Sequence, residues 1–596
     1  MILRKLGFVV LLLSVIQFSC SKQEKITKPI KAITFHTETY ELDWQEIELL
    51  ERKGAGKSIV EKVDAILLKS KSKGNYPQVF KALAYRSKYI NQIEEESTFK
   101  ILSQYEEELR SAAFPLRSIL HSALGELYFQ YFNQNSWRVQ HRTTTIGFEP
   151  KDLKTWSLNQ IIDTANFHYL NSLNEKENLS QTPIKHLEQI LNQTDLKMDS
   201  YFDGQIIRNN LYDFLAHRAL DYFKLGNNRK NIPINEFKID KYPVFSNYST
   251  FINIQVDSID KFSPKRQTLL IFQEILKNSN QVQKVSYDLN RLLHYYNVSD
   301  KEDKDSLYLK ALNNLKKEYA SHAEITYAIA DLYFRWGNEF DFSKPESLKK
   351  QWYLKKAKKL LETIPKEDLS FGAKKAQVLI NQIMAKQLQF NVEKFYTPSE
   401  FMLFQLQFKN IDEVFVRIIK AEDVAFIPNK YFRIEEKAKS LAKSKVLKEF
   451  KIALNTPDDL QHHSAEIMHK EKLEIGNYYL LVSANKDFNI SENALCFQNF
   501  QVSKLAFITR NNTLNNGTEI LVLDRENGRP VEKATIEVYN YTYDYNNREN
   551  KYVLDKVYKS DKNGKAIIPA EKDARNKKIK VSKDHDVVET DPHYFS

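Results

Sequence analysis

The sequence predicts a multidomain α + β protein in which an N-terminal α-helical, repeat-like region precedes antiparallel β-sandwich domains. Apolar residues recur at helical spacing over residues 31–394. Further along, Phe404, Leu406 and Phe408 alternate with glutamines, a period of two that is typical of a half-buried strand. Turn signals then follow about every ten residues, which favours antiparallel sandwiches over other β folds.

The helical region is expected over residues 20–395 and contains an internal repeat. Residues 120–131 and 325–336 align without gaps and share an acid, a Leu-Tyr-Phe run and an aromatic end. Repeated helical hairpins stack because one unit alone cannot bury its apolar face. The Leu124-Gly125-x-x-Tyr128 pattern resembles the first helix of a tetratricopeptide repeat, so we expect a degenerate, tetratricopeptide-like solenoid. Further helices are predicted at 211–223 and 352–364.

The first 19 residues form a predicted lipoprotein signal peptide. Arg4 and Lys5 are followed by an apolar run over residues 6–16, which is too short to span a bilayer as a stable helix. A small residue then directly precedes Cys20, as in a loose bacterial lipobox. We therefore predict that Cys20 carries the lipid that anchors the mature chain. Ser21, rather than Asp, after the cysteine favours the outer membrane.

The first sandwich is expected over residues 396–504. Its predicted elements are a turn at 410–413 with a return strand at 414–419, a Lys-rich helical insertion at 434–454, a turn at 473–477 into a strand at 478–482, and a strand at 494–502. Cys496 falls in the last of these and is expected to be a buried, small apolar residue.

The second sandwich is expected over residues 505–596. A β-rich run at 518–523 leads into the turn 524–528, and an alternating strand follows at 534–541. Residues 561–564 read Asp-Lys-Asn-Gly, and Asn-Gly supplies the positive φ angles that a tight hairpin needs. This segment lacks the spaced oxygen ligands of a calcium loop, so a hairpin turn is the better interpretation.

The sequence over residues 470–570 resembles the macroglobulin-like β-sandwiches of bacterial α2-macroglobulin family proteins, and the rest of the chain resembles them less specifically. There a strand, D-x-x-x-G-x-P-V, A-x-V-x-V-Y and a D-x-x-G hairpin recur, as they do here over 518–569. The family phrases L-P-x-G-x-Y-x-L and F-x-V-S are matched by Leu473, Gly476, Tyr478, Leu480, Phe500, Val502 and Ser503, with Glu474-Ile475 in place of the usual proline. Residues 211–223 resemble a phrase in the helical N-terminal part of Bacteroidetes-type lipoproteins of this family.

The resemblance implies a membrane-anchored endopeptidase inhibitor with macroglobulin-like domains, and not an enzyme. Full members carry a C-G-E-Q thioester, whereas here Cys496 is followed by Phe-Gln-Asn, so no thioester is expected. The family phrase T-D-R-x-x-Y-R-P-G is also missing. We therefore expect the second sandwich to be truncated and further domains to belong downstream.

No motif for a catalytic site, metal or cofactor is found, and none is predicted. Asp213 and His217 lie four apart on one helical face, where a helix-surface hydrogen bond is a better interpretation than a metal pair. Three histidines, His462, His463 and His469, are expected in a polar loop rather than at a metal.

The formal charge of +11 comes from lysines scattered along the chain, which is typical of solvated helix faces and not of a nucleic-acid patch. The expected partners are proteases and, through the lipid, a membrane of the bacterial cell envelope, with the protein facing the periplasm or the cell surface.

Two alternatives remain at the level of the sequence. One is a helical-repeat outer-membrane lipoprotein that binds a ligand, like the starch-utilisation proteins, which share its size, lipid anchor and tetratricopeptide-like helices. Those proteins are helical nearly throughout, which the β-rich last third opposes. The other is an envelope scaffold.

Overall fold

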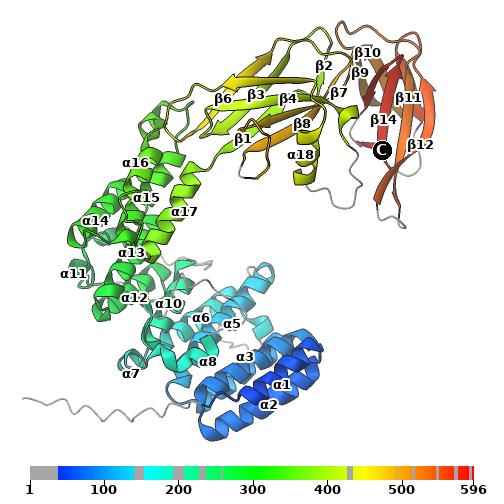
Figure 1. The fold of residues 1–596 in the computed structure, drawn as a ribbon. Helices are drawn as coiled ribbons and strands as arrows, with labels where there is room; N and C mark the ends of the chain where they lie inside the picture. Colours follow the sequence, from blue (N-terminus) through cyan, green and yellow to red (C-terminus); the bar gives the residue numbers. More distant parts are fainter. Residues whose placement is uncertain are drawn as a thin grey trace, which may run out of the picture. The chain divides into compact units, whose positions relative to one another are not determined.

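The computed structural model describes most of the chain, in two compact units, Met1–Ala311 and Leu312–Ser596. The described residues are 38–139, 142, 153–191, 207–226, 236–256, 260–425, 434–491, 493–512, 517–544, 549–569, 575–589 and 593–595. The predicted helical N-terminal half and strand-rich C-terminal part are both present (Figure 1).

The first unit is helical over its described residues. Its helices are α1 (Glu41–Arg52), α2 (Gly56–Lys73), α3 (Tyr76–Ile93), α4 (Ser97–Ser111), α5 (Leu116–Val139), α6 (Leu158–Asn171), α7 (Lys176–Ser180), α8 (Glu188–Leu191), α10 (Leu211–Lys224), α11 (Tyr248–Phe251), α12 (Pro264–Asn278), α13 (Gln281–Val298) and α14 (Lys304–Glu318), the last of which reaches into the second unit. The apolar stripes that predicted helices over 120–131 and 211–223 lie buried in one continuous core.

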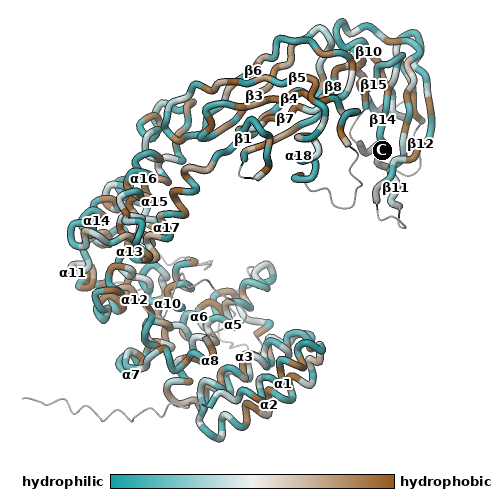
Figure 2. The backbone as a smooth tube through the Cα atoms, in the orientation of Figure 1, coloured by the Kyte–Doolittle hydropathy of each residue, from teal (hydrophilic) through white to brown (hydrophobic). Residues whose placement is uncertain are grey.

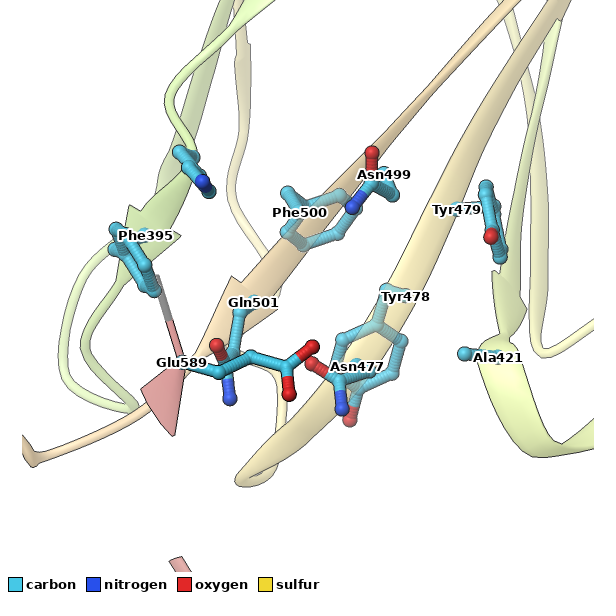
Figure 3. A pocket seen from close by; sticks show the side chains of 10 residues that line it. Phe395, Ala421, Asn477, Tyr478, Tyr479, Asn499, Phe500, Gln501 and Glu589 are labelled. Carbon is cyan, nitrogen blue, oxygen red and sulfur yellow. The ribbon is translucent and has the colours of Figure 1, made fainter. Parts of the chain in front are cut away.

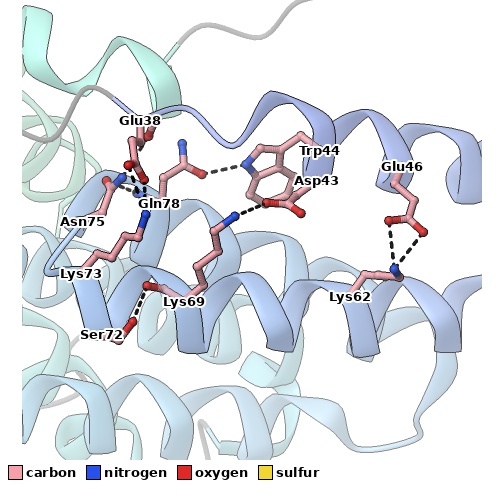
Figure 4. A network of polar contacts seen from close by, with 10 residues as sticks. All are labelled: Glu38, Asp43, Trp44, Glu46, Lys62, Lys69, Ser72, Lys73, Asn75 and Gln78. Atoms are coloured by element: carbon pink, nitrogen blue, oxygen red, sulfur yellow. Dashed lines mark hydrogen bonds and ion pairs between the residues drawn. The ribbon is translucent and has the colours of Figure 1, made fainter.

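Helices α1 and α2 are joined along their exposed edges by three ion pairs (Figure 4). The pairs are Glu38–Lys73, Asp43–Lys69 and Glu46–Lys62, each at 2.8 Å. Pairs this exposed contribute little to stability. The buried Trp44 indole, which donates to the Gln78 side chain at 2.7 Å, links α1 to α3 more firmly because both groups are shielded from water.

The internal repeat is helical in both copies, but a tetratricopeptide architecture is not confirmed. Residues 120–131 lie in α5, and residues 325–336 lie in α15 (Ala323–Asn338). Gly125 lets α5 approach α6 closely, because a Cβ atom at this position would lie 2.7 Å from the Tyr169 ring. The second copy is followed by a 3-10 turn (Pro345–Lys350) before the next helix, α16 (Tyr353–Leu361).

The helical pattern was expected to run to residue 394, but α17 (Phe371–Met384) ends ten residues earlier and a strand, β1 (Gln387–Val392), follows. Asn410 donates its side-chain amide to the carbonyls of Ile383 and Ala385, at 2.8 and 3.2 Å. These bonds satisfy carbonyl groups at the helix end, so a residue distant in sequence helps to terminate α17.

The first sandwich has two sheets of strand orders β1-β3-β6 and β2-β8-β7-β4-β5. Its other strands are β2 (Phe395–Tyr396), β3 (Met402–Lys409), β4 (Glu413–Lys420), β5 (Lys448–Ala453), β6 (His462–His469), β7 (Gly476–Ser483) and β8 (Leu495–Val502). Pairing is antiparallel except between β2 and β8. Apolar residues of both sheets share one core, as alternation along β3 predicted.

Two predictions for this sandwich were wrong in detail. The strand predicted at 414–419 does not return beside β3, because β4 crosses to the other sheet and pairs with β5 and β7. The Lys-rich insertion is helical only in α18 (Ile434–Lys443), and its end forms β5. In β5, Phe450 and Ile452 alternate with exposed residues against β4, which outweighs the helix propensity of the lysines.

The second sandwich has sheets of order β13-β10-β9 and β12-β11-β14-β15, with β16 beside β14. Its strands are β9 (Leu505–Asn512), β10 (Gly517–Asp524), β11 (Thr535–Asp544), β12 (Glu549–Lys559), β13 (Lys565–Pro569), β14 (Arg575–Lys583), β15 (Asp586–Glu589) and β16 (His593–Phe595). The alternation in β11 breaks after Val538, where the structure has a β-bulge. Hydrophobic and hydrophilic stretches alternate along these strands (Figure 2).

The turn at 561–564 is tight, as predicted, but it is not a hairpin. Asp561 accepts the Lys565 amide at 2.8 Å through Oδ1, and Gly564 has a φ of +73°. The flanking strands β12 and β13 belong to different sheets, so the chain changes sheet here. A Cβ at Gly564 would lie 2.4 Å from the Val522 carbonyl oxygen, so glycine is needed for space as well as for φ.

Candidate functional site

A two-residue linker, Ser503-Lys504, joins β8 of the first sandwich to β9 of the second, and its backbone bonds to residues of both sandwiches. Ser503 is fully buried, and its hydroxyl accepts the Leu505 amide at 2.9 Å. Asp586, at the start of β15, accepts the amides of Lys504 and Leu505 at 2.7 and 3.3 Å. The Arg525 guanidinium donates to the Leu505 carbonyl at 2.8 Å. With its backbone groups paired in this way, the linker acts as a fixed joint rather than a flexible tether.

A cavity of about 240 Å3 lies beside this joint (Figure 3). Asn477 lies opposite Gln501, and Tyr479 lies opposite Asn499, on neighbouring strands β7 and β8. These four side chains share the sheet face away from the sandwich core, because side chains alternate along a strand. Glu589 of the second sandwich completes the lining at the end of β15.

The cavity is lined mainly by amide, phenol and aromatic side chains. The other residues that line the cavity are Lys394, Phe395, Ala421, Tyr478 and Phe500. The Glu589 carboxylate forms an ion pair with Lys578 at 2.8 Å, and the Gln501 amide donates to the Val587 carbonyl. Amide and phenol groups can bind a neutral polar molecule, but the lining holds no pairing of a nucleophile with a general base.

Asp586 is expected to hold the joint rigid. In Asp586→Ala the Lys504 amide loses its acceptor, which costs about 1–3 kcal/mol locally, whereas the Leu505 amide keeps the Ser503 hydroxyl as its acceptor. Hydrogen exchange of the Lys504 amide, followed by mass spectrometry of the full chain, should accelerate by about 10-fold or more. Glu532→Ala, an exposed substitution in the same sandwich, should leave this amide unchanged. Equal exchange in both variants would show that Asp586 does not order the linker.

Asp213 and His217 were expected at a helix surface, and this was wrong, since they are only 4% and 3% exposed. The His217 Nδ1 atom is 2.7 Å from the backbone oxygen of Asp213. The Asp213 side chain accepts from Asn210 and Gln283, at 2.8 and 2.9 Å. Burial raises the pKa of Asp213 to about 6 and lowers the pKa of His217 to about 3. The pair is therefore part of a polar network inside the core.

The three later histidines lie in strand β6 and not in a polar loop. His463 contacts the fully buried Asp459 at 2.9 Å, and Asp459 also accepts from Gln351 at 2.8 Å. His469 stacks on the Phe450 ring, with centroids 4.6 Å apart. His462 and His463 are adjacent in a strand and so point to opposite faces. Across the part of the chain that the structure describes, no group of three or more His, Cys, Asp or Glu side chains could hold a metal.

Cys496 lies in β8, as predicted, with its side chain partly buried against the first core. Burial raises the pKa of its thiol to about 12, so the thiol stays protonated and unreactive near neutral pH. Gln498 is two residues further along the same strand, and its amide donates to the Val392 carbonyl at 3.3 Å. The two side chains therefore lie along an extended strand, which differs from the compact turn of a thioester. Cys20, the predicted lipid site, lies outside the described residues.

No helix among the described residues is long and apolar enough to cross a membrane. No protein-family model matches the sequence, and no curated protein matches it.

Among solved structures, the chain is similar to three of Escherichia coli α2-macroglobulin. A fragment spanning domains NIE-MG1 is 12% identical, with 35% of this chain and 97% of that chain covered and a TM-score of 0.24. A fragment spanning MG0-NIE-MG1 is 16% identical, with 35% of this chain and 64% of that chain covered and a TM-score of 0.25. The protein activated by porcine elastase is 12% identical, with 35% of this chain and 22% of that chain covered and a TM-score of 0.17. The chain thus spans less than two thirds of the two longer proteins. TM-scores this low carry no argument about fold or function.

Proposed function

We propose that this chain belongs to the bacterial α2-macroglobulin family, is anchored to the cell envelope through a lipid on Cys20, and inhibits endopeptidases without capturing them covalently. The outer membrane is the proposed location. No nucleic acid or cofactor is involved in this proposal.

The observation that carries the proposal is where the family's phrases fall in the fold. Tyr478, Leu480, Phe500 and Val502 are at most 2% exposed and belong to the core of the first sandwich. The serine that ends F-x-V-S is Ser503, whose buried hydroxyl caps the linker into the second sandwich. Both D-x-x-G-type phrases end in glycines with φ of +73°, Gly528 and Gly564. The residues named here therefore have structural reasons for their identities, which supports the proposed homology.

The alternative of a helical-repeat, ligand-binding lipoprotein gains no support from the fold. Such proteins are helical nearly throughout, whereas here strands form two sandwiches after residue 386. No particular residue among those described supports the alternative function of an envelope scaffold.

Inhibition is tested by incubating the full chain with trypsin and with endopeptidases of other cleavage preferences. We expect reversible inhibition of protein-substrate cleavage and no denaturant-stable conjugate by mass spectrometry, because the Cys496 thiol is protonated and no C-G-E-Q turn exists. A Cys496→Ser variant, which keeps the size and strand position, should behave identically.

Two outcomes would count against the proposal in different ways. A lack of inhibition for every endopeptidase would remove the inhibitory role. A conjugate joined through Gln498 would instead show that the chain forms an activated acyl group, which would contradict non-covalent inhibition.

A further inference from the structure

Two histidines on adjacent helices of the first unit lie in direct contact through their ring nitrogens. The Nδ1 atoms of His121, in α5, and His168, in α6, are 2.9 Å apart. The two rings are tilted by 43°. A simple hydrogen bond here requires that one Nδ1 carries a proton and the other does not. Neither the sequence motifs nor the proposed inhibitory function accounts for this pair.

Both imidazoles are held in the neutral form, which is the form that binds metals. Burial lowers the pKa of His168 to about 3, and burial also lowers the pKa of His121. Neither ring therefore carries a second proton at neutral pH, and an ion has to displace only the single Nδ1 proton that lies between the two rings.

The packing orients one ring and leaves the other accessible. His168 is 6% exposed and stacks on the Tyr128 ring at 5.7 Å. His121 is only partly buried and lies edge-on to Phe167, which is 53% exposed. An ion could therefore reach the pair from the side of His121, and modest rotation of that ring would turn both lone pairs toward one point.

The separation of the two nitrogens is close to that of two ligands on one metal ion. At metal–nitrogen distances of about 2.0–2.1 Å, two nitrogens 2.9 Å apart subtend roughly 90° at the ion, as in square-planar or tetragonal sites. A tetrahedral angle would need a separation of about 3.3 Å at the same bond lengths. Imidazole suits copper, nickel and zinc, and Cu2+ is the most tightly bound of the divalent series. The ligand type and this affinity order favour Cu2+, with Ni2+ next, and a separation that stays near 2.9 Å after the ring rotates would fit their tetragonal angles.

We propose that His121 and His168 form a two-nitrogen site for a divalent transition ion of tetragonal preference, Cu2+ or Ni2+. No third His, Cys, Asp or Glu joins them among the described residues, so water or another small ligand completes the coordination. Arg117, whose charge also lowers the pKa of His121, opposes a cation and keeps the affinity modest. The site is distinct from the joint between the sandwiches, which lies in the other unit.

The test compares Cu2+ binding by the full chain, its His121→Asn variant and a control, His585→Asn, which removes an exposed histidine of the second sandwich. Titration should show one fewer equivalent in His121→Asn, or a dissociation constant at least 10-fold weaker, with no change in the control. Electron paramagnetic resonance of the wild type at one equivalent should show coupling to two imidazole nitrogens.

A second measurement uses the wild-type chain and so does not depend on a variant's folding. Diethylpyrocarbonate modifies accessible neutral imidazoles, and peptide mass spectrometry reports each site. Ni2+ should protect His121 from modification and leave His585 reactive. The proposal is overturned if His121→Asn binds Cu2+ as the wild type does, or if Ni2+ does not protect His121; the pair would then be a hydrogen-bonded imidazole pair alone.

Discussion

Arg291→Met should destabilise the first unit by about 3–5 kcal/mol, because it leaves the buried Asp288 carboxylate without its guanidinium partner. Arg291 is fully buried and donates to Asp288 at 2.6 Å. It also donates to the carbonyls of Val244 and Ser246 and lies over the Phe251 ring. One side chain on α13 thus holds the irregular segment that leads into α11.

The measurement is hydrogen exchange of peptides from α11 and α13 in the full chain, which reports the free energy of local opening. Arg335→Met is the matched control, since Arg335 forms the same kind of helical pair with Asp331 but is 41% exposed at its side chain. That control should cost at most about 1 kcal/mol. Adding Asp288→Asn to Arg291→Met should restore part of the loss by removing the uncompensated charge. Equal effects of Arg291→Met and the control would refute the buried-pair argument.

Acidification to pH 4.5 should destabilise the first unit by on the order of 5 kcal/mol. His168, His217 and His294 are at most 8% exposed, and burial lowers the pKa of each to about 3. Between their unfolded pKa of about 6.5 and their folded pKa the unfolded chain binds more protons, so stability is present above about pH 6.5 and is lost as the pH falls. Each group contributes about 2.7 kcal/mol at pH 4.5.

Asp213 acts in the opposite direction and offsets part of this loss. Its folded pKa, about 6, lies above its unfolded value, so its protonated form favours the native state as the pH falls below 6. This gain is about 2 kcal/mol at pH 4.5, smaller than the loss from three histidines.

Hydrogen exchange of α6, α10 and α13 peptides at pH 7 and pH 4.5, corrected for the intrinsic rate, measures the effect. His217→Asn keeps a donor near the Nδ1 position and should flatten the pH dependence by about 2–3 kcal/mol. His585→Asn, a substitution at an exposed turn, should leave the pH dependence of exchange unchanged. Protection that is independent of pH over this range would contradict the assignment of these histidines as buried and neutral.

Local patterns determined most of the elements and their order. The stripe over 211–223 predicted α10, and alternation in Phe404, Leu406 and Phe408 predicted β3, because each pattern has the period of the structure it forms. Asn-Gly at 563–564 predicted the positive φ at Gly564. The register shift between β11 and β12 at Val538 and Tyr539 was not predicted, because the sequence analysis expected regular alternation over 534–541.

Tertiary structure alone decided which elements pair, and hence where the candidate sites lie. Strands β4 and β13 follow recognisable turns but cross to the opposite sheet, since a turn signal does not specify the partner of the next strand. The end of α17 depends on Asn410, the linker depends on Asp586 more than 80 residues away, and His121 meets His168 across two helices. Burial of Asp213 and His217 was likewise invisible, because spacing reports the face a residue occupies but not what covers that face. Contacts between residues distant in sequence form only in the folded chain, and these contacts position the polar side chains of the linker and of the histidine pair.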